Sequence, residues 1–119
     1  MKVLAVHGTH TKPCTTKSEC IRRMQEIQIV DIYQKKMPDI NYNFLIGGDG
    51  NVYEGRGFAK KVSPTSDYVP NSLVVGFIGN WAVEEMPEMF EEILTEFCRL
   101  YVKEGKINPN YKDYFEVGY

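Results

Sequence analysis

The hydrophobic positions of this chain fall into short apolar runs and into longer stretches with helical spacing. Residues 3–6 form a short run rich in β-branched side chains, typical of a buried strand. Residues 73–78 are almost continuously apolar, which predicts a central strand covered on both faces. Between these runs, the apolar segments 44–46 and 52–53 flank a glycine-rich turn at 47–50, and an Asp-Gly turn of this kind predicts a hairpin.

A first helix is predicted over residues 17–36. Thr16 followed by Glu19 fits a capping box, in which each side chain accepts a hydrogen bond from a free backbone N–H at the helix start. Pro38 lies just beyond the predicted end. The apolar positions of this helix include Ile21, Met24, Ile27 and Ile32.

A second helix is predicted between Pro87, which suits a first helical turn, and Gly105, which suits a helix end. Its apolar stripe consists of Phe90, Ile93, Leu94, Phe97, Cys98, Tyr101 and Val102. Side chains at this spacing lie on one face of a helix, so we interpret the stripe as a core face.

The order of elements is strand, helix, hairpin, strand, helix. It predicts an α/β (α+β) fold in which a central mixed β-sheet is flanked by helices. The 119 residues are enough for a single domain spanning 1–119.

Composition excludes several classes of protein. With 43 % hydrophobic residues, 25 % charged residues and a net charge of −2, the chain is typical of a globular domain. It lacks the clustered basic residues of a nucleic-acid binder, and no apolar run is long enough for a membrane span. No signal peptide is visible, so we expect a cytosolic protein or a piece of a longer precursor.

The chain has three cysteines, so at least one is unpaired within it. Cys14 and Cys20 are close in sequence and Cys98 is distant. The short spacing suits a small disulfide loop, which would indicate an oxidising compartment, and it suits three reduced thiols equally well.

Residues 41–58, which read NYNFLIGGDGNVYEGRGF, resemble the signature hairpin of peptidoglycan recognition proteins. These are animal immune proteins related to N-acetylmuramoyl-L-alanine amidases. Residues 6–9 resemble the family's Val-His-His-Thr strand end, and residues 71–81 resemble its central strand and the turn that follows. Cys14 and Cys20 have the spacing of the family's short disulfide loop. The likeness covers roughly residues 3–114.

The resemblance implies a mixed sheet flanked by helices, with a groove on one face that holds a muramyl peptide. It favours a Cys14–Cys20 disulfide, with Cys98 a buried free thiol or the partner of a cysteine absent from this chain. A disulfide would imply a secreted or extracellular protein. The chain begins at the family's first strand and ends where its last strand arrives, so we expect the family's N-terminal segment and C-terminal helix to be missing.

In amidase members of the family, two histidines and a cysteine bind zinc. The resemblance places His7 at the first histidine position and Glu116 at the second, while the cysteine has no counterpart. Cys98 lies on the core stripe, and a metal site through His10 is a weaker alternative. Tyr42 matches the tyrosine that helps to polarise the substrate carbonyl. We therefore predict no catalytic residue, no metal and no cofactor.

Seven residues remain as candidates for binding a ligand. They are His7, Thr9, Tyr42, Arg56, Phe58, Tyr68 and Asn71. The groove differs from the family pattern at Ser63-Pro64, where an Ala-His pair is usual, and at Phe58-Ala59-Lys60. Two candidates also have structural interpretations, since Tyr42 suits a strand edge and Arg56 could pair with a neighbouring segment.

The predicted function is non-catalytic binding of muropeptide, or of a protein partner in innate immune signalling. One alternative is a zinc amidase in which Glu116 is a metal ligand. The other is an interaction module, because a missing helix would expose apolar surface that an oligomer or a partner would cover.

Overall fold

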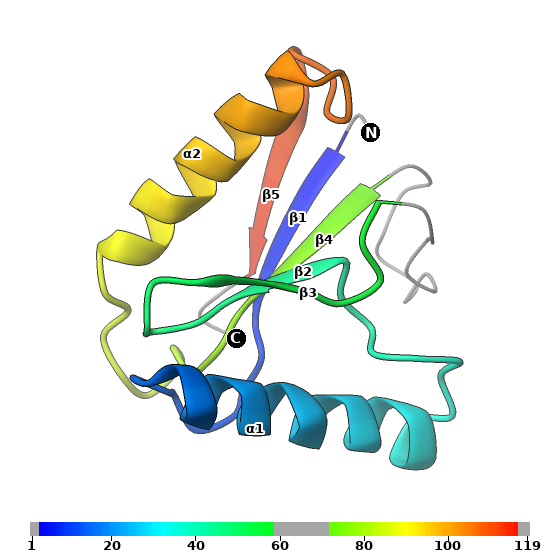
Figure 1. Cartoon of the computed structure of the whole chain (residues 1–119), viewed down its shortest axis with the longest axis vertical. Coiled ribbons are helices and arrows are strands. Elements are labelled where there is room, and N and C mark those ends of the chain that lie inside the picture. The colour runs from blue at the N-terminus through cyan, green and yellow to red at the C-terminus, as the bar shows by residue number, and fades with distance from the viewer. Residues whose placement is uncertain (1–2, 59–71, 117–119) are drawn as a thin grey trace.

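The structure is a computed structural model that describes residues 3–58 and 72–116, with only the backbone of 114–116. Its elements are β1 (Val3–Gly8), α1 (Lys17–Ile29), η1 (Val30–Gln34), β2 (Phe44–Ile46), β3 (Val52–Glu54), β4 (Ser72–Phe77), α2 (Met89–Lys103) and β5 (Lys112–Glu116). Figure 1 shows the helices arranged around one sheet. Residues 59–71 lie outside the described residues.

The described strands form one sheet in the order β3-β2-β4-β1-β5. Strand β1 is parallel to β4 and β5, β2 is parallel to β4, and β3 is antiparallel to β2. The predicted mixed sheet, its hairpin and its central strand β4 are therefore confirmed.

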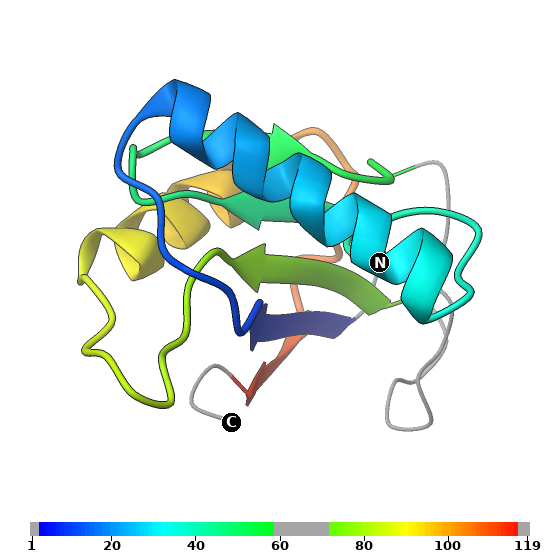
Figure 2. The same ribbon diagram turned by 90° about the horizontal axis from the view of Figure 1, so that it is seen from below.

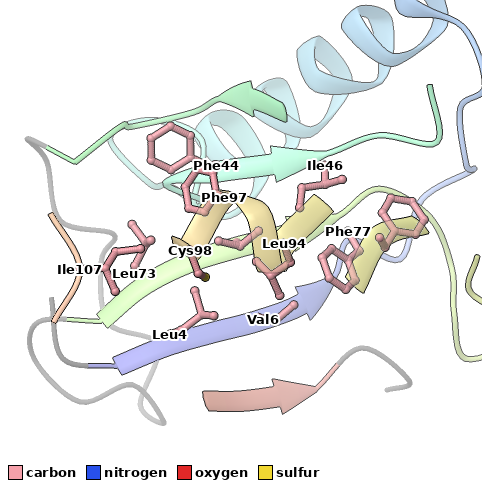
Figure 3. Close-up of a cluster of buried hydrophobic side chains, with 12 residues drawn as sticks. Leu4, Val6, Phe44, Ile46, Leu73, Phe77, Leu94, Phe97, Cys98 and Ile107 are labelled. Atoms are coloured by element: carbon pink, nitrogen blue, oxygen red, sulfur yellow. The ribbon is translucent and has the colours of Figure 1, made fainter. Parts of the chain in front are cut away.

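Different helices cover the two faces of the sheet (Figures 1 and 2). Leu4 and Val6 of β1 share a core cluster with Leu94 of α2, shown in Figure 3. Leu45 of β2 belongs instead to a cluster with Ile27 of α1. Because side chains alternate along a strand, these two clusters lie on opposite faces.

Helix α2 has the predicted position and the predicted buried face. It begins just after Pro87, and Gly105 follows its end with a φ of 78°. Phe90, Leu94, Phe97 and Cys98 are buried, and Ile93, Tyr101 and Val102 pack against them. Cys98 is a free, buried cysteine, one of the two predicted alternatives.

Helix α1 begins as predicted but differs in three details. Thr16 Oγ1 accepts from Glu19 N–H at 3.2 Å, whereas the Glu19 carboxylate accepts from Thr15 N–H at 2.7 Å, not from Thr16. Ile21, one of the apolar positions of the predicted helix, is 40 % exposed, because the helix rests on the sheet through Cys20 and Ile27. The helical segment ends at Gln34 rather than at the predicted position 36.

The last turn of this helix, η1, is π-helical, and it determines where Asp31 lies. A π-helical turn inserts an extra residue and so shifts the side chains that follow relative to an α-helix. Asp31 is 2 % exposed, and its Oδ2 accepts from Asn41 N–H at 2.8 Å. Its other oxygen lies 3.6 Å from Lys35 Nζ.

The hairpin turn packs on a disulfide between Cys14 and Cys20, and the predicted pairing is confirmed. Both cysteines are buried. A Cβ atom at Gly47 would lie 2.7 Å from Cys20 Sγ, and one at Gly48 would lie 2.2 Å from the Cys14 carbonyl oxygen. The turn approaches the loop too closely for side chains at these two positions.

Asn43 connects β2 to its neighbours from inside the protein. Its side chain is fully buried; Nδ2 donates to Gly57 O at 2.9 Å, and Oδ1 accepts from Val74 N–H at 2.7 Å. Its backbone carbonyl accepts from Gly55 and Gly57 N–H at 2.9 and 3.0 Å. These bonds hold the start of β2, and thus Tyr42, against β4.

Asp49 in the hairpin turn makes the stability of the turn depend on pH. It accepts hydrogen bonds from the Tyr53 hydroxyl and from Asn51. Partial burial raises the pKa of Asp49, but the bonds from Tyr53 and Asn51 lower it more, so it lies below its ordinary value. Because the folded pKa is depressed, this stabilisation is present above the ordinary carboxyl pKa and is lost as pH falls through the folded value.

We expect Tyr53→Phe to lower the free energy of unfolding by about 1 kcal/mol at pH 7, and by less below about pH 4. Urea denaturation at both pH values measures the difference. Tyr33→Phe is the matched control, because its side chain is 69 % exposed on η1. An equal loss of unfolding free energy at both pH values would show that the Tyr53 hydroxyl stabilises the fold independently of its bond to ionised Asp49.

Candidate functional site

The floor of the candidate site is a tyrosine ring lying on a glycine of the central strand. A Cβ atom at Gly76 of β4 would lie 2.8 Å from two ring carbons of Tyr42 and 3.1 Å from Thr9 Cγ2. Ala5 and Val74 are buried beneath the same ring. Only glycine leaves room for the ring at this position, so Gly76 sets the depth of the floor.

Thr9 fixes one end of this floor. Its N–H donates to Phe77 O at 3.1 Å, and its Oγ1 accepts from Gly79 N–H at 3.0 Å and lies 2.8 Å from Thr11 Oγ1. The loop after β1 is therefore tied to the end of β4.

Helical residues form the opposite wall of a groove of about 360 Å³. The groove, as we use the term below, is lined by Thr9, His10, Thr11, Glu26, Ile27, Val30, Asp31, Lys35 and Tyr42. Its sides thus come from the loop after β1 and from the α1–η1 helix, with Tyr42 between them.

Two acidic side chains in the groove are each paired with a basic side chain. Glu26 bonds Arg23 Nη1 at 3.0 Å, and Lys35 lies beside Asp31 at 3.6 Å. Two hydroxyl-bearing threonines and a tyrosine add hydrogen-bonding groups above an apolar floor. A concave surface with a few placed polar groups suits a ligand that carries both hydrogen-bonding and apolar parts.

The predicted ligand-binding residues do not all meet at this groove. Thr9 and Tyr42 line it, and His7 is the register partner of Gly76, on the same face of β1 as Ala5. Tyr68 and Asn71, like Ser63, Pro64, Ala59 and Lys60, lie outside the described residues.

Arg56 and Phe58 lie elsewhere in the structure. Arg56 Nε donates to Ile40 O at 2.6 Å and its Nη2 donates to Asp39 O at 3.1 Å, the structural pairing considered above. Phe58 packs on Phe44 and Phe97, on the α2 side of the sheet. Neither side chain lines the groove, and a ligand-binding role for them stays a prediction.

A zinc centre of the amidase type needs three protein ligands and a water. His7 and Glu116 are register partners on β1 and β5, but the Glu116 side chain lies outside the described residues. Within the described part of the chain, no three His, Cys, Asp or Glu residues come together to hold a metal ion. The described residues do not fit a three-ligand zinc site.

Comparison with known proteins identifies the family that has this fold. No protein-family model matches the chain. Peptidoglycan-recognition protein 2 of Holotrichia diomphalia is 34 % identical over 112 residues, which are 94 % of this chain and 60 % of that protein. The X-ray structure of bumblebee PGRP-SA matches with a TM-score of 0.90 and 31 % identity, over 97 % of this chain and 69 % of that one. The chain belongs to the peptidoglycan recognition protein family.

Members of the family have been solved with a ligand. Peptidoglycan recognition protein LE in complex with tracheal cytotoxin, a monomeric diaminopimelic acid-type peptidoglycan, matches with a TM-score of 0.89 and 29 % identity. The match covers 96 % of this chain and 67 % of that one. This peptidoglycan recognition domain spans about 60 % of the length of the relative from Holotrichia diomphalia.

Five polar residues that line the groove were not among the predicted ligand-binding residues: His10, Thr11, Glu26, Asp31 and Lys35. The sequence pattern could have indicated Asp31 as a site residue, because it follows Ile27 by one helical turn and so places an acid on an apolar stripe. No pattern indicates Glu26 or Lys35, because charged residues on a helix are ordinarily solvated.

Proposed function

We propose that this chain is a non-catalytic peptidoglycan recognition domain that binds a muropeptide in the groove between α1–η1 and the loop after β1. The observation that carries the proposal is the Tyr42 ring lying on Gly76, because it makes a flat apolar floor with hydroxyl groups beside it. Aromatic faces with a few placed polar groups hold ligands of this kind. Tracheal cytotoxin bound to a family member of the same fold supports this class of ligand.

The set of metal donors supports the absence of amidase chemistry. The resemblance puts Glu116 where amidase members have a histidine, and among the described residues no three metal donors come together. Binding of muropeptide needs no metal, so the groove can serve recognition alone.

The Cys14–Cys20 disulfide supports an oxidising compartment, and we propose that the protein is secreted or extracellular. Among the described residues, no helix has the length and apolar character needed to cross a bilayer. In that setting the protein would meet bacterial wall fragments, and recognition would contribute to innate immunity.

Retention on insoluble peptidoglycan tests the proposal. We expect Tyr42→Ala to weaken retention about tenfold, which corresponds to about 1.4 kcal/mol. Gly76→Ala should have a similar effect, because its Cβ would displace the ring. Tyr33→Ala, an exposed tyrosine on η1, should bind as the unchanged chain does. If the unchanged chain is retained no more than heat-denatured protein, peptidoglycan is not the ligand of the groove. A protein partner would then be the remaining candidate.

One observation favours a second candidate, a zinc amidase with a carboxylate ligand. His7 and Glu116 lie side by side in the register of β1 and β5. Metal analysis after dialysis, together with an assay for released stem peptides, separates the two functions. Bound zinc below about one tenth of an equivalent, with no release, would reject the amidase.

A further inference from the structure

Strand β3 forms one edge of the sheet, and among the described strands it has a neighbour, β2, on one side only (Figure 2). The register of this antiparallel pair places Tyr53 opposite Leu45. An edge strand presents backbone N–H and C=O groups to which another extended segment can bond. The direction of these groups decides whether the outer edge of β3 can accept a further strand.

The hydrogen bonds at the two ends of the hairpin show which backbone groups of β3 face β2. Gly47 N–H donates to Asn51 O at 3.1 Å, and Gly55 N–H donates to Asn43 O at 2.9 Å. Bonded and non-bonded positions alternate along an antiparallel pair. The backbone groups of residues 51, 53 and 55 therefore face β2.

Val52 and Glu54 consequently direct their N–H and C=O groups away from β2, toward the outer edge. Val52 is 39 % exposed and Glu54 is exposed as well. Neither N–H donates to a loop or turn in the described part of the chain. Two donors and two acceptors at alternate residues match the repeat of an extended peptide.

A pocket of about 230 Å³ lies beside this edge, between β3 and α1. Its apolar lining includes Ile21 and Met24 of α1 and Ile40, and Ile21 is 40 % exposed. Tyr53 also lines it and packs with the core cluster on the α1 side of the sheet. Residues opposite each other on neighbouring strands point to the same face, so a side chain opposite Tyr53 on an added strand would point into this pocket.

The charged residues of the pocket are acidic. Asp39 and Glu54 line it, and no lysine or arginine is among its described lining residues. The Asp39 carboxylate accepts from Gln28 Nε2 at 3.0 Å and from Ile40 N–H at 2.7 Å. Glu54 stands on the outer edge itself, where a cation on a neighbouring strand would form a favourable cross-strand pair and an anion would be repelled.

We propose that the outer edge of β3 binds an extended basic segment of a partner protein, which joins the sheet as an antiparallel strand. Backbone bonds to Val52 and Glu54 hold the segment, and an apolar side chain opposite Tyr53 fills the pocket. A lysine or arginine next to that side chain in sequence lies opposite Glu54. No residue of the pocket lines the muropeptide groove, so the domain can hold both ligands at once.

The test titrates the 119-residue chain into a short fluorescein-labelled peptide with a central leucine between two lysines, followed by fluorescence anisotropy. In the added strand the N–H groups of the lysines face β3, whereas that of the leucine points away. We expect N-methylation of both lysines to weaken binding at least tenfold and N-methylation of the leucine to leave it unchanged. Glutamates in place of the lysines should also weaken binding at least tenfold.

Val52→Pro tests the same bonds from the side of the protein, because it removes one outward N–H. Proline is tolerated on an edge strand where the N–H faces solvent, so the pairing of β3 with β2 should persist. We expect this variant to bind the lysine peptide at least tenfold more weakly. Val52→Ala, which keeps the N–H, is the matched control and should bind as the unchanged chain does. Both variants should keep their retention on peptidoglycan.

Several results would overturn the proposal. They are no binding of the lysine peptide, equal effects of methylation at leucine and at lysine, equal binding of the glutamate peptide, and equal peptide binding by Val52→Pro and Val52→Ala. A dimer in sedimentation that Val52→Pro dissociates would also overturn it, since β3 of a second copy would then occupy the edge. If Val52→Pro does not fold, the two methylated peptides decide.

Discussion

Replacing Asn43 by alanine is expected to lower the free energy of unfolding by about 3 kcal/mol. The amide of Asn43 satisfies Val74 N–H and Gly57 O in a fully buried place. Alanine removes both bonds and leaves two backbone groups without their partners where water does not reach, and each such group costs about 1–3 kcal/mol. For a domain with a total stability of about 5–15 kcal/mol, this is a large fraction.

Urea denaturation followed by Trp81 fluorescence measures the loss. Asn110→Ala is the matched control, because Asn110 is exposed in the loop before β5 and its replacement should change stability by less than about 0.5 kcal/mol. If Asn43→Ala costs less than about 1 kcal/mol, water or a rearranged backbone replaces the amide, and the connection between β2 and β4 is weaker than described.

The Cys14→Ala, Cys20→Ala double variant should lose about 2–3 kcal/mol. The disulfide closes a short loop, for which the lost entropy of the unfolded chain accounts for about 2 kcal/mol. The rest comes from the buried contact between the disulfide and the hairpin turn at Gly47. The amides of Gly47 and Gly50, which bond Asn51 O and Gly47 O, should exchange with solvent faster in the variant.

Reduction provides the comparison for this variant. In a strong reductant the unchanged protein should fall to the stability of the double variant, and the double variant should not change. An unchanged urea midpoint for the reduced protein would contradict the prediction. The Cys98 thiol should not affect this comparison, because it is buried and burial raises its pKa, which makes the thiol less reactive.

Much of the fold is predictable because its signals are local. The start of α1 follows from Thr16 and Glu19, three residues apart, and the end of α2 follows from Gly105. The stripe on α2 predicts its buried face because helical spacing alone decides which side chains share a side. The hairpin turn is local as well, since positive φ at Gly50 is a requirement of the turn itself.

The site is less predictable because it depends on contacts between distant segments. Arg56 bonds carbonyls 16 and 17 residues earlier, a use that no pattern around it indicates. Phe58 is placed on the α2 side by the path of the chain through Gly55 and Gly57, where spacing rules for strands no longer apply. Asp31 and Lys35 reach the groove through a π-helical turn, which a regular period of 3.6 residues does not predict.

The sheet order also has a consequence for synthesis. Strand β1 lies between β4 and β5, so it is bonded on both edges by strands that leave the ribosome much later than β1 does. Parallel pairings of this range form slowly, since long loops must close first. At about 5–20 residues per second, β1 stays unpaired for several seconds of translation, with its apolar side chains uncovered. We therefore expect chaperones to shield β1 in the nascent chain until β5 has been made.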